Sequence, residues 1–124
     1  MVSVDKIAAQ ALANCEQFTA LLAHGASSIY HDDAPENGEY PLLQYMDVSE
    51  SPVLHADNRL KAFEKVIRVT AIDNTNARRH ALKEAIYKAM TDAGFMWNMT
   101  TTTRDINEYY TSMDFSYGVE VQNI

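Results

Sequence analysis

The side chains that could do chemistry are four histidines, one cysteine and a short run of metal-ligand types, His31-Asp32-Asp33. A metal site built on that run would need a second group of ligands at helical or zinc-type spacing, and the sequence offers none. We therefore interpret the run as part of a solvated acidic loop. His24, His55 and His80 stand apart from one another. Their isolation favours surface or hydrogen-bonded histidines over a general base.

The sequence supports a nucleophilic site or a phosphate-binding site no more strongly than it supports a metal site. Cys15 would need a histidine partner and an exposed, electropositive setting to act as a nucleophile, but it falls on the apolar stripe of an expected helix. The four glycines are scattered and form no phosphate-binding loop. The aromatic residues of the last third could stack on single-stranded nucleic acid, but most fall on the expected core face. We therefore predict that the protein is not an enzyme and binds no cofactor or metal.

Length and composition predict one ordinary globular domain. The chain has 124 residues, of which 47% are hydrophobic and 22% are charged. It contains no apolar run near the roughly 20 residues that cross a bilayer, and its first residues do not resemble a secretory signal. A single cysteine excludes an internal disulfide. Cytosolic synthesis is the expectation that follows.

Charge is distributed unevenly along the chain. Residues 1–58 hold nine acidic residues and one basic residue, whereas residues 59–124 hold eight acidic and nine basic residues. Within the second half, residues 59–88 hold eight basic and three acidic residues. This division is compatible with a solvated surface of mixed sign, and also with a subunit whose acidic side docks on a neighbour's basic side. The net charge of −7 argues against tight binding to nucleic-acid phosphates.

A neighbour-binding surface would use the acidic loops of the first half and the basic start of the second helix. The candidate interface residues are Asp32, Asp33, Glu36, Glu39, Asp47, Glu50, Arg78, Arg79 and Lys83. Arg78 and Arg79 lie in an expected first helical turn, where the helix dipole disfavours cations by roughly 0.3–1 kcal/mol each. Either an internal carboxylate such as Asp73 or a neighbouring subunit's acidic loop could offset this cost. If the neighbour does so, Arg78→Glu with Arg79→Glu should leave the monomer folded but block assembly.

A sheet and two helices are expected to position these side chains. Residues 109–121 alternate between apolar and polar side chains, which predicts a long strand with one apolar face and one wet face. Such a strand needs neighbouring strands and a layer over its apolar face. Further strands are predicted at residues 29–30, 42–48, 59–72 and 96–104, with a bend or bulge near Ala62–Glu64 and a loop over 49–58.

Helices are predicted over residues 4–22 and 75–93, where apolar residues recur at spacings of three and four. Ser3 and Asn76 are the expected N-caps, and Gly25 and Gly94 are the expected stops. The predicted order is α-β-β-β-α-β-β. The predicted fold is a single α+β domain over residues 1–124, a mostly antiparallel sheet with two helices packed on one face.

The order of elements and several residues resemble the tail-completion or tail-terminator proteins of long-tailed bacteriophages and related prophages. The resemblance rests on a first amphipathic helix, the Ile29-Tyr30 strand, a loop ending in Ala34-Pro35-Glu-Asn-Gly-Glu-Tyr40-Pro41, the strand Ile67-Arg-Val-Thr-Ala-Ile72, the helix Ala81–Met90 and a closing hairpin. It spans about residues 4–122, and its motifs are structural, not catalytic.

The resemblance implies a virion structural protein that caps the tail tube and joins it to the head connector as a ring, typically a hexamer. Its partners would be further copies of itself, the major tail tube protein and the head connector protein. Genomic DNA would only pass through the ring, and no membrane would be involved. The subunit would be made in the host bacterial cytoplasm and end at the head-tail junction of the virion. Two alternatives stay open: another phage head-tail connector or minor tail adaptor subunit, and a small bacterial ligand-binding or enzymatic α+β domain.

Overall fold

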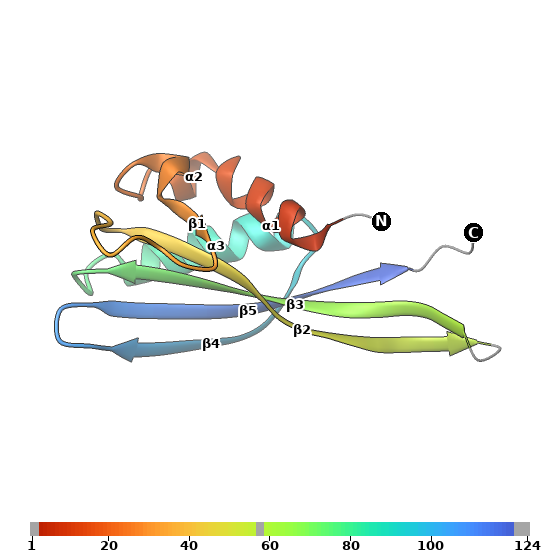
Figure 1. Ribbon diagram of the computed structural model, residues 1–124. Helices are drawn as coiled ribbons and strands as arrows, with labels where there is room; N and C mark the ends of the chain where they lie inside the picture. The colour runs from red at the N-terminus through yellow and green to blue at the C-terminus, as the bar shows by residue number, and fades with distance from the viewer. Residues whose placement is uncertain (1–2, 57–58, 121–124) are drawn as a thin grey trace.

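Figure 1 shows the computed structural model, which describes residues 3–56 and 59–120. The elements are α1 (Val4–Ala13), α2 (Glu16–Thr19), a 3₁₀ turn η1 (Gly25–Ser28), β1 (Ile29–His31), β2 (Leu42–Ala56), β3 (Arg59–Asp73), α3 (Arg79–Asp92), β4 (Met96–Arg104) and β5 (Tyr109–Glu120). The α+β class is confirmed.

The five strands form one mixed sheet in the order β1-β2-β3-β5-β4. β1 runs parallel to β2, and the other neighbouring pairs are antiparallel. The sheet is therefore mostly antiparallel, as predicted. β5 lies between β3 and β4, so the long alternating strand has neighbours on both sides. Its predicted last residue, Val121, lies outside the described residues.

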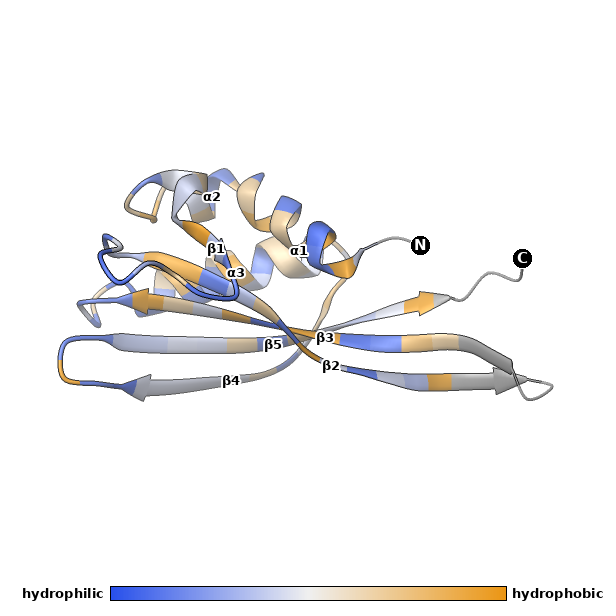
Figure 2. Ribbon diagram, in the orientation of Figure 1, coloured by the Kyte–Doolittle hydropathy of each residue, from blue (hydrophilic) through white to orange (hydrophobic). Residues whose placement is uncertain are grey.

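The helices lie on one side of the sheet in Figure 1, where they cover the central strands. In Figure 2, hydrophobic and hydrophilic residues alternate along α1, the pattern of a helix with one buried face. The core joins buried side chains of both layers: Val4, Ala8 and Leu12 of α1, Leu82, Ala85, Ile86, Ala89 and Met90 of α3, and Leu43, Ile67, Val69, Ala71, Met113 and Phe115 of the sheet. Ile67, Val69 and Ala71, at alternate positions of β3, thus share its core face.

The other face of β5 is not the wet face that the alternation predicts. Asp114 and Ser116 are only 9% and 7% exposed. The reason is the interior position of β5 between β3 and β4, because side chains of these flanking strands cover it. Arg68 of β3 holds the carboxylate of Asp114 through hydrogen bonds of 2.8 and 3.2 Å, and Ser116 donates to the Asn98 side chain of β4 at 3.1 Å.

The prediction of one helix over residues 4–22 is wrong. α1 ends at Ala13, and the short α2 begins at Glu16, so the described residues contain three α-helices and not two. Cys15 separates them in an extended conformation, with φ −86° and ψ 101°. The change of direction still brings Phe18 and Leu22 into the core, where they are 0% and 6% exposed. The apolar residues of the predicted stripe thus still face the core, although they do not lie along a single helix axis.

The predicted loop over residues 49–58 is wrong for residues 49–56, because β2 continues to Ala56. Antiparallel pairing with β3 satisfies the backbone there, despite the Ser, Glu and Pro residues that suggest a loop. Asp57 and Asn58 lie outside the described residues. The expected irregularity near Ala62 is present, since the register shifts on β2 opposite it. Figure 1 shows the β2–β3 hairpin extending well beyond the helices.

α3 begins at Arg79, four residues later than predicted, and no side chain caps it. Asn76 instead belongs to the turn before the helix, where its carbonyl accepts the Arg79 N–H at 3.3 Å. The predicted stop is confirmed. Gly94 has φ +97°, and the N–H groups of Gly94 and Phe95 bond the carbonyls of Thr91 and Met90, each at 3.0 Å.

Candidate interaction surface

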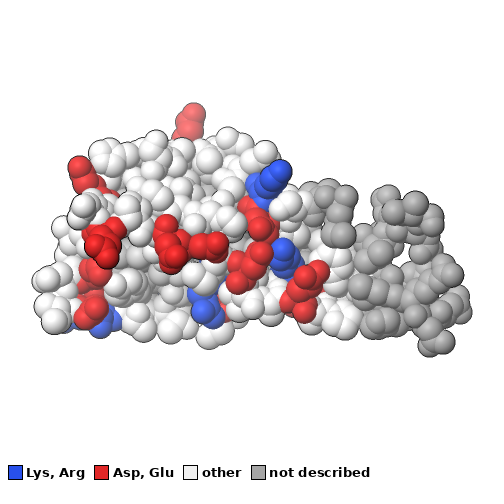
Figure 3. Space-filling model, in the orientation of Figure 1, with Lys and Arg blue, Asp and Glu red and all other residues white. Residues whose placement is uncertain are grey.

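The predicted acidic residues gather at the β1–β2 side of the sheet. They lie in the loop after β1 and on β2, and all six are exposed: Asp32, Asp33, Glu36, Glu39, Asp47 and Glu50. Figure 3 shows Asp and Glu side chains collected over the region where Figure 1 draws β1 and this loop. The loop leaves β1 through Asp32, whose φ is +66° and whose N–H bonds the Tyr45 carbonyl at 2.9 Å. That bond fixes where the acidic segment begins.

Some of these carboxylates already have partners within the chain. Glu39 lies 3.2 Å from His24, and Asp32 lies 3.7 Å from His31. The ion pairs of the described residues include neither Asp33, Glu36 nor Glu50. Among the described residues, these three acids therefore have no cation partner within the chain, and they could meet a cation of another molecule.

Asp47 belongs to a separate cluster with Asp5 and Lys65. The Lys65 ammonium lies 3.2 Å from each carboxylate. Although Asp47 is exposed, the partial burial of its carboxylate raises its pKa above the ordinary value, and its contact with Asp5 raises it further. Burial also acts to raise the pKa of Asp5, but hydrogen bonds with Asp47 and Lys65 and the Lys65 charge lower it overall. Asp47 is therefore engaged inside the subunit, unlike Glu50.

On the basic side, Arg78 is also engaged within the subunit. It forms two hydrogen bonds of 2.9 and 2.7 Å with Asp73, which is buried at the end of β3. Of the two alternatives for offsetting this cation, the internal carboxylate is the one present. Arg78 is therefore not available to a neighbouring subunit, because removing its charge would leave the Asp73 carboxylate without a cation.

Arg79 and Lys83 have no carboxylate partner among the ion pairs of the described residues. Arg79 donates to the Thr111 hydroxyl at 3.3 Å and lies over the ring of Tyr109, 5.7 Å from its centroid. Arg104 lies over the same ring at 5.2 Å. The structure thus brings the remaining predicted cations to the α3 side of the sheet, next to β4 and β5.

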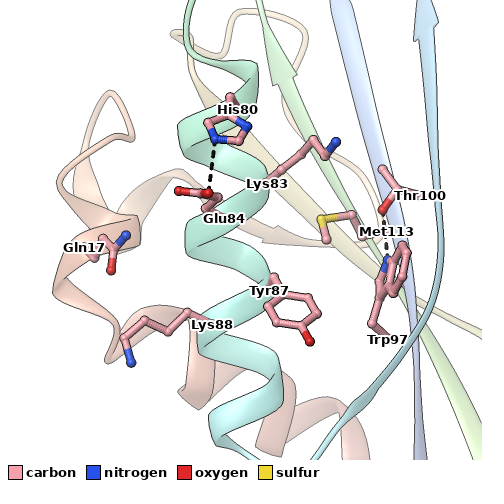
Figure 4. A pocket seen from close by; sticks show the side chains of 9 residues that line it. All are labelled: Gln17, His80, Lys83, Glu84, Tyr87, Lys88, Trp97, Thr100 and Met113. Carbon is pink, nitrogen blue, oxygen red and sulfur yellow. Dashed lines mark hydrogen bonds and ion pairs between the residues drawn. The ribbon is translucent and has the colours of Figure 1, made fainter.

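Lys83 lines a groove of about 550 Å³ between α3 and β4 that the sequence did not reveal. Tyr87 and Trp97 form its walls, with ring centroids 6.4 Å apart in an edge-to-face arrangement. Figure 4 shows Tyr87 between helix and strand and Lys83 reaching towards Thr100, whereas Lys88 and Gln17 line the groove from the other flank of α3. The indole of Trp97 donates to the Thr100 hydroxyl at 2.9 Å. The available signal was Tyr87, which falls outside the apolar stripe of its helix.

A metal-binding cluster is absent from the part of the chain that the structure describes. No group of three or more His, Cys, Asp or Glu side chains there could hold a metal ion. None of the helices among the described residues has the length and apolarity needed to span a membrane. His80 pairs with Glu84 at 3.1 Å on the surface of α3, and Cys15 is half-buried against the core. The described surface thus presents charged and exposed apolar side chains that could contact another molecule.

Comparison of the chain with models of known protein families and with curated proteins found no match in either case.

Proposed function

We propose that this protein is a non-enzymatic subunit of a bacteriophage virion. It completes the tail and joins it to the head connector, as part of a ring of six copies at the head-proximal end of the tail tube. The major tail tube protein and the head connector protein are its other partners, and genomic DNA passes through the ring. The resemblance in element order and motifs gives the proposal its content, and the surface chemistry of the subunit supports self-assembly.

One observation carries the proposal: the two sides of the sheet differ in the way that a ring requires. The sheet order puts the β1–β2 side, with its acidic residues, at one edge and β4 at the other. Lys83 and Arg79 project from α3 next to the β4 edge. A closed ring uses two different and complementary surfaces on each subunit, joined head to tail. A two-fold dimer would instead need one self-complementary surface.

A small-molecule-binding domain is the second candidate, because the groove between α3 and β4 falls within the size range of ligand pockets. Such pockets bury most of their ligand's surface. Here the two aromatic walls are themselves half-exposed, Tyr87 by 49% and Trp97 by 48%. A groove this open is better suited to binding a segment of a protein than to enclosing a small ligand. The groove therefore favours the structural role.

The test is native mass combined with particle composition. Light scattering across a wide protein concentration range should detect a species of about 84 kDa, six times the 14.0 kDa chain. Negative-stain electron microscopy should show it as a ring with a central opening. Mass spectrometry of virions from a host carrying the gene should find the chain in tail-bearing particles. Its absence from purified virions would overturn the proposed function, and a bound small molecule in native mass spectra would favour the second candidate.

A further inference from the structure

The large apolar side chains exposed on the described surface fall into two groups. Val48 and Val53 lie on β2, and they are 42% and 56% exposed. The other group comprises Tyr87 of α3 and Met96, Trp97 and Met99 of β4. Ile106, in the turn between β4 and β5, stands outside both groups. Apolar surface is thus concentrated at the two opposite edges of the sheet, and contiguous patches of this kind mark contact sites.

β4 is an edge strand that lacks two of the usual protections against pairing or docking. Its residues from Met96 to Thr103 include no charge and no proline, and all except Thr100 are exposed along the strand. Figure 2 shows the strand in pale colours of intermediate hydropathy. Exposed edges usually carry charged side chains, prolines or bulges that keep other chains away. The single bulge, at Asn98, lies beside the groove walls. This edge is therefore suited to being covered.

The opposite edge has the complementary properties. β1 pairs only with residues 43–45 of β2, so β2 has a free edge beyond Tyr45. Along it, Val48 and Val53 are bulged residues with no counterpart on β3, and Pro52 lacks an N–H. Such a stretch cannot continue a regular ladder of hydrogen bonds. It instead presents two exposed valines, with the exposed Glu50 between them in sequence.

We propose that the groove between α3 and β4 binds the stretch 47–53 of β2 from a second copy of this chain. The valines pack against Tyr87 and Trp97, and Glu50 meets Lys83. Charge complementarity supports this occupant, since Glu50 and Lys83 both lack an ion-pair partner among the described residues. A subunit's own β2 is separated from its groove by β3 and β5, so the contact joins two copies. This inference rests on the proposed ring and names the surfaces that build it.

Trp97 makes the contact directly measurable, because it is the chain's single tryptophan. Its emission should move to shorter wavelength as protein concentration rises, in step with the mass seen by sedimentation, since docking removes the indole from water. Glu50→Lys and Lys83→Glu should each raise the concentration at half-association by about tenfold, and the double variant should restore it. Val53→Ser should weaken association similarly.

The matched controls change the same chemistry elsewhere. Glu16→Lys and Lys6→Glu make the same charge reversals on α2 and α1, at exposed residues that do not line the groove, and Ile106→Ser removes an exposed apolar side chain. All three should leave the half-association concentration unchanged. Circular dichroism and thermal unfolding verify that every variant is folded, so that a weakened contact is not mistaken for an unfolded chain.

The outcomes separate the docking from the proposed function. Oligomers that form without a change in Trp97 emission, and without sensitivity to the two charge reversals, overturn the docking but leave the ring intact. A wild-type chain that stays monomeric with constant emission at all concentrations also overturns it, and the virion composition then decides the proposed function by itself. A shift of the Trp97 emission that follows the mass seen by sedimentation, and that is restored in the double variant, supports the contact.

Discussion

The guanidinium of Arg78 donates from Nε to Oδ2 of Asp73 at 2.9 Å and from Nη2 to Oδ1 at 2.7 Å. Asp73 is the last residue of β3 and is 3% exposed, and Arg78 immediately precedes α3. The Asp73 carboxylate also accepts the Asn74 N–H at 2.8 Å. One buried carboxylate thus holds the connection between the central sheet and the helix that covers it.

Arg78→Ala should destabilise the monomer by about 1–3 kcal/mol, because it leaves the buried Asp73 carboxylate without its cation. Urea unfolding at neutral pH measures the loss. Arg79→Ala is the matched control, since Arg79 bonds a hydroxyl and no carboxylate, and its cost should stay below about 1 kcal/mol. Equal losses for the two variants would contradict this assignment. The double reversal Arg78→Glu with Arg79→Glu, which the sequence suggests as a pure assembly variant, should therefore damage the fold itself.

Gly94→Ala should cost about 1 kcal/mol or more, because the residue ends α3 with φ +97°, a conformation that side chains disfavour. The ring of Tyr117 lies 3.5 Å from where the new Cβ would be, an ordinary contact, so backbone strain is the cause. Gly118→Ala provides the comparison. Nothing lies within 4 Å of its Cβ position, and its stability should change little. Thermal unfolding of both variants tests the difference, and an unharmed Gly94→Ala protein would refute it.

Asp5→Asn should lower stability at neutral pH by about 0.5–1 kcal/mol, because it removes a carboxylate held by Lys65. The folded-state pKa of Asp5 lies below its ordinary value of 3.8. Its contribution is therefore present above that value and lost as the pH falls through the lowered pKa. The difference between wild type and variant should accordingly disappear in acid.

Carboxyl-carbon NMR titration supplies a second readout for the same variant. The pKa of Asp47 is raised by burial and then by its contact with Asp5, so it should fall in Asp5→Asn. Asp92→Asn, which breaks an exposed pair with Lys88 on α3, should leave the Asp47 titration unchanged. An Asp47 pKa that ignores Asp5 would show that the two carboxylates are not coupled.

Tyr110 should be among the last of the seven tyrosines to ionise. A 2.6 Å hydrogen bond to Glu108, with burial adding to it, raises its pKa to about 12. Tyr40 donates to the same carboxylate at 2.6 Å, and its pKa is raised as well. Alkaline absorbance titration should show both pKa values falling in Glu108→Gln. Because the folded-state pKa is raised, this stabilisation is present below pH 10 and is lost as the pH rises through 12.

The predicted fold is correct where the periodicity of apolar residues reflects which side chains are buried. The strands around Ile67 and Phe115 are correctly predicted because apolar and polar residues alternate along them. The end of α3 is correctly predicted because Gly94 adopts the positive φ that ends the helix. The errors arise where tertiary contact overrides local preference. Residues 49–56 look like a loop, yet pairing with β3 makes them strand, and the helix breaks at Cys15 so that Phe18 can reach the core.

The candidate surface was predictable only in part. Counting charges identified the acidic residues, all of which are exposed, but it could not reveal which charges are already paired. Arg78 and Asp73 are five residues apart in sequence, and their pairing depends on how the turn between strand and helix bends. The groove was missed because Tyr87 and Trp97 come from different elements, and only packing of α3 against the sheet brings them together.

The order of the strands also determines which parts of the sheet can form while the chain is being synthesised. β5 leaves the ribosome after β4, yet it occupies the place between β3 and β4 and supplies Met113 and Phe115 to the core. Until β5 has been made, no strand lies between β3 and β4, and the backbone groups of β3 and β4 that β5 will bond have no partner. Its contacts with β3 join residues about 40 to 60 positions apart, which makes closure a slow, long-range step. The sheet should therefore close only after β5 has been synthesised, and until then the chain should depend on chaperones that shield open strands.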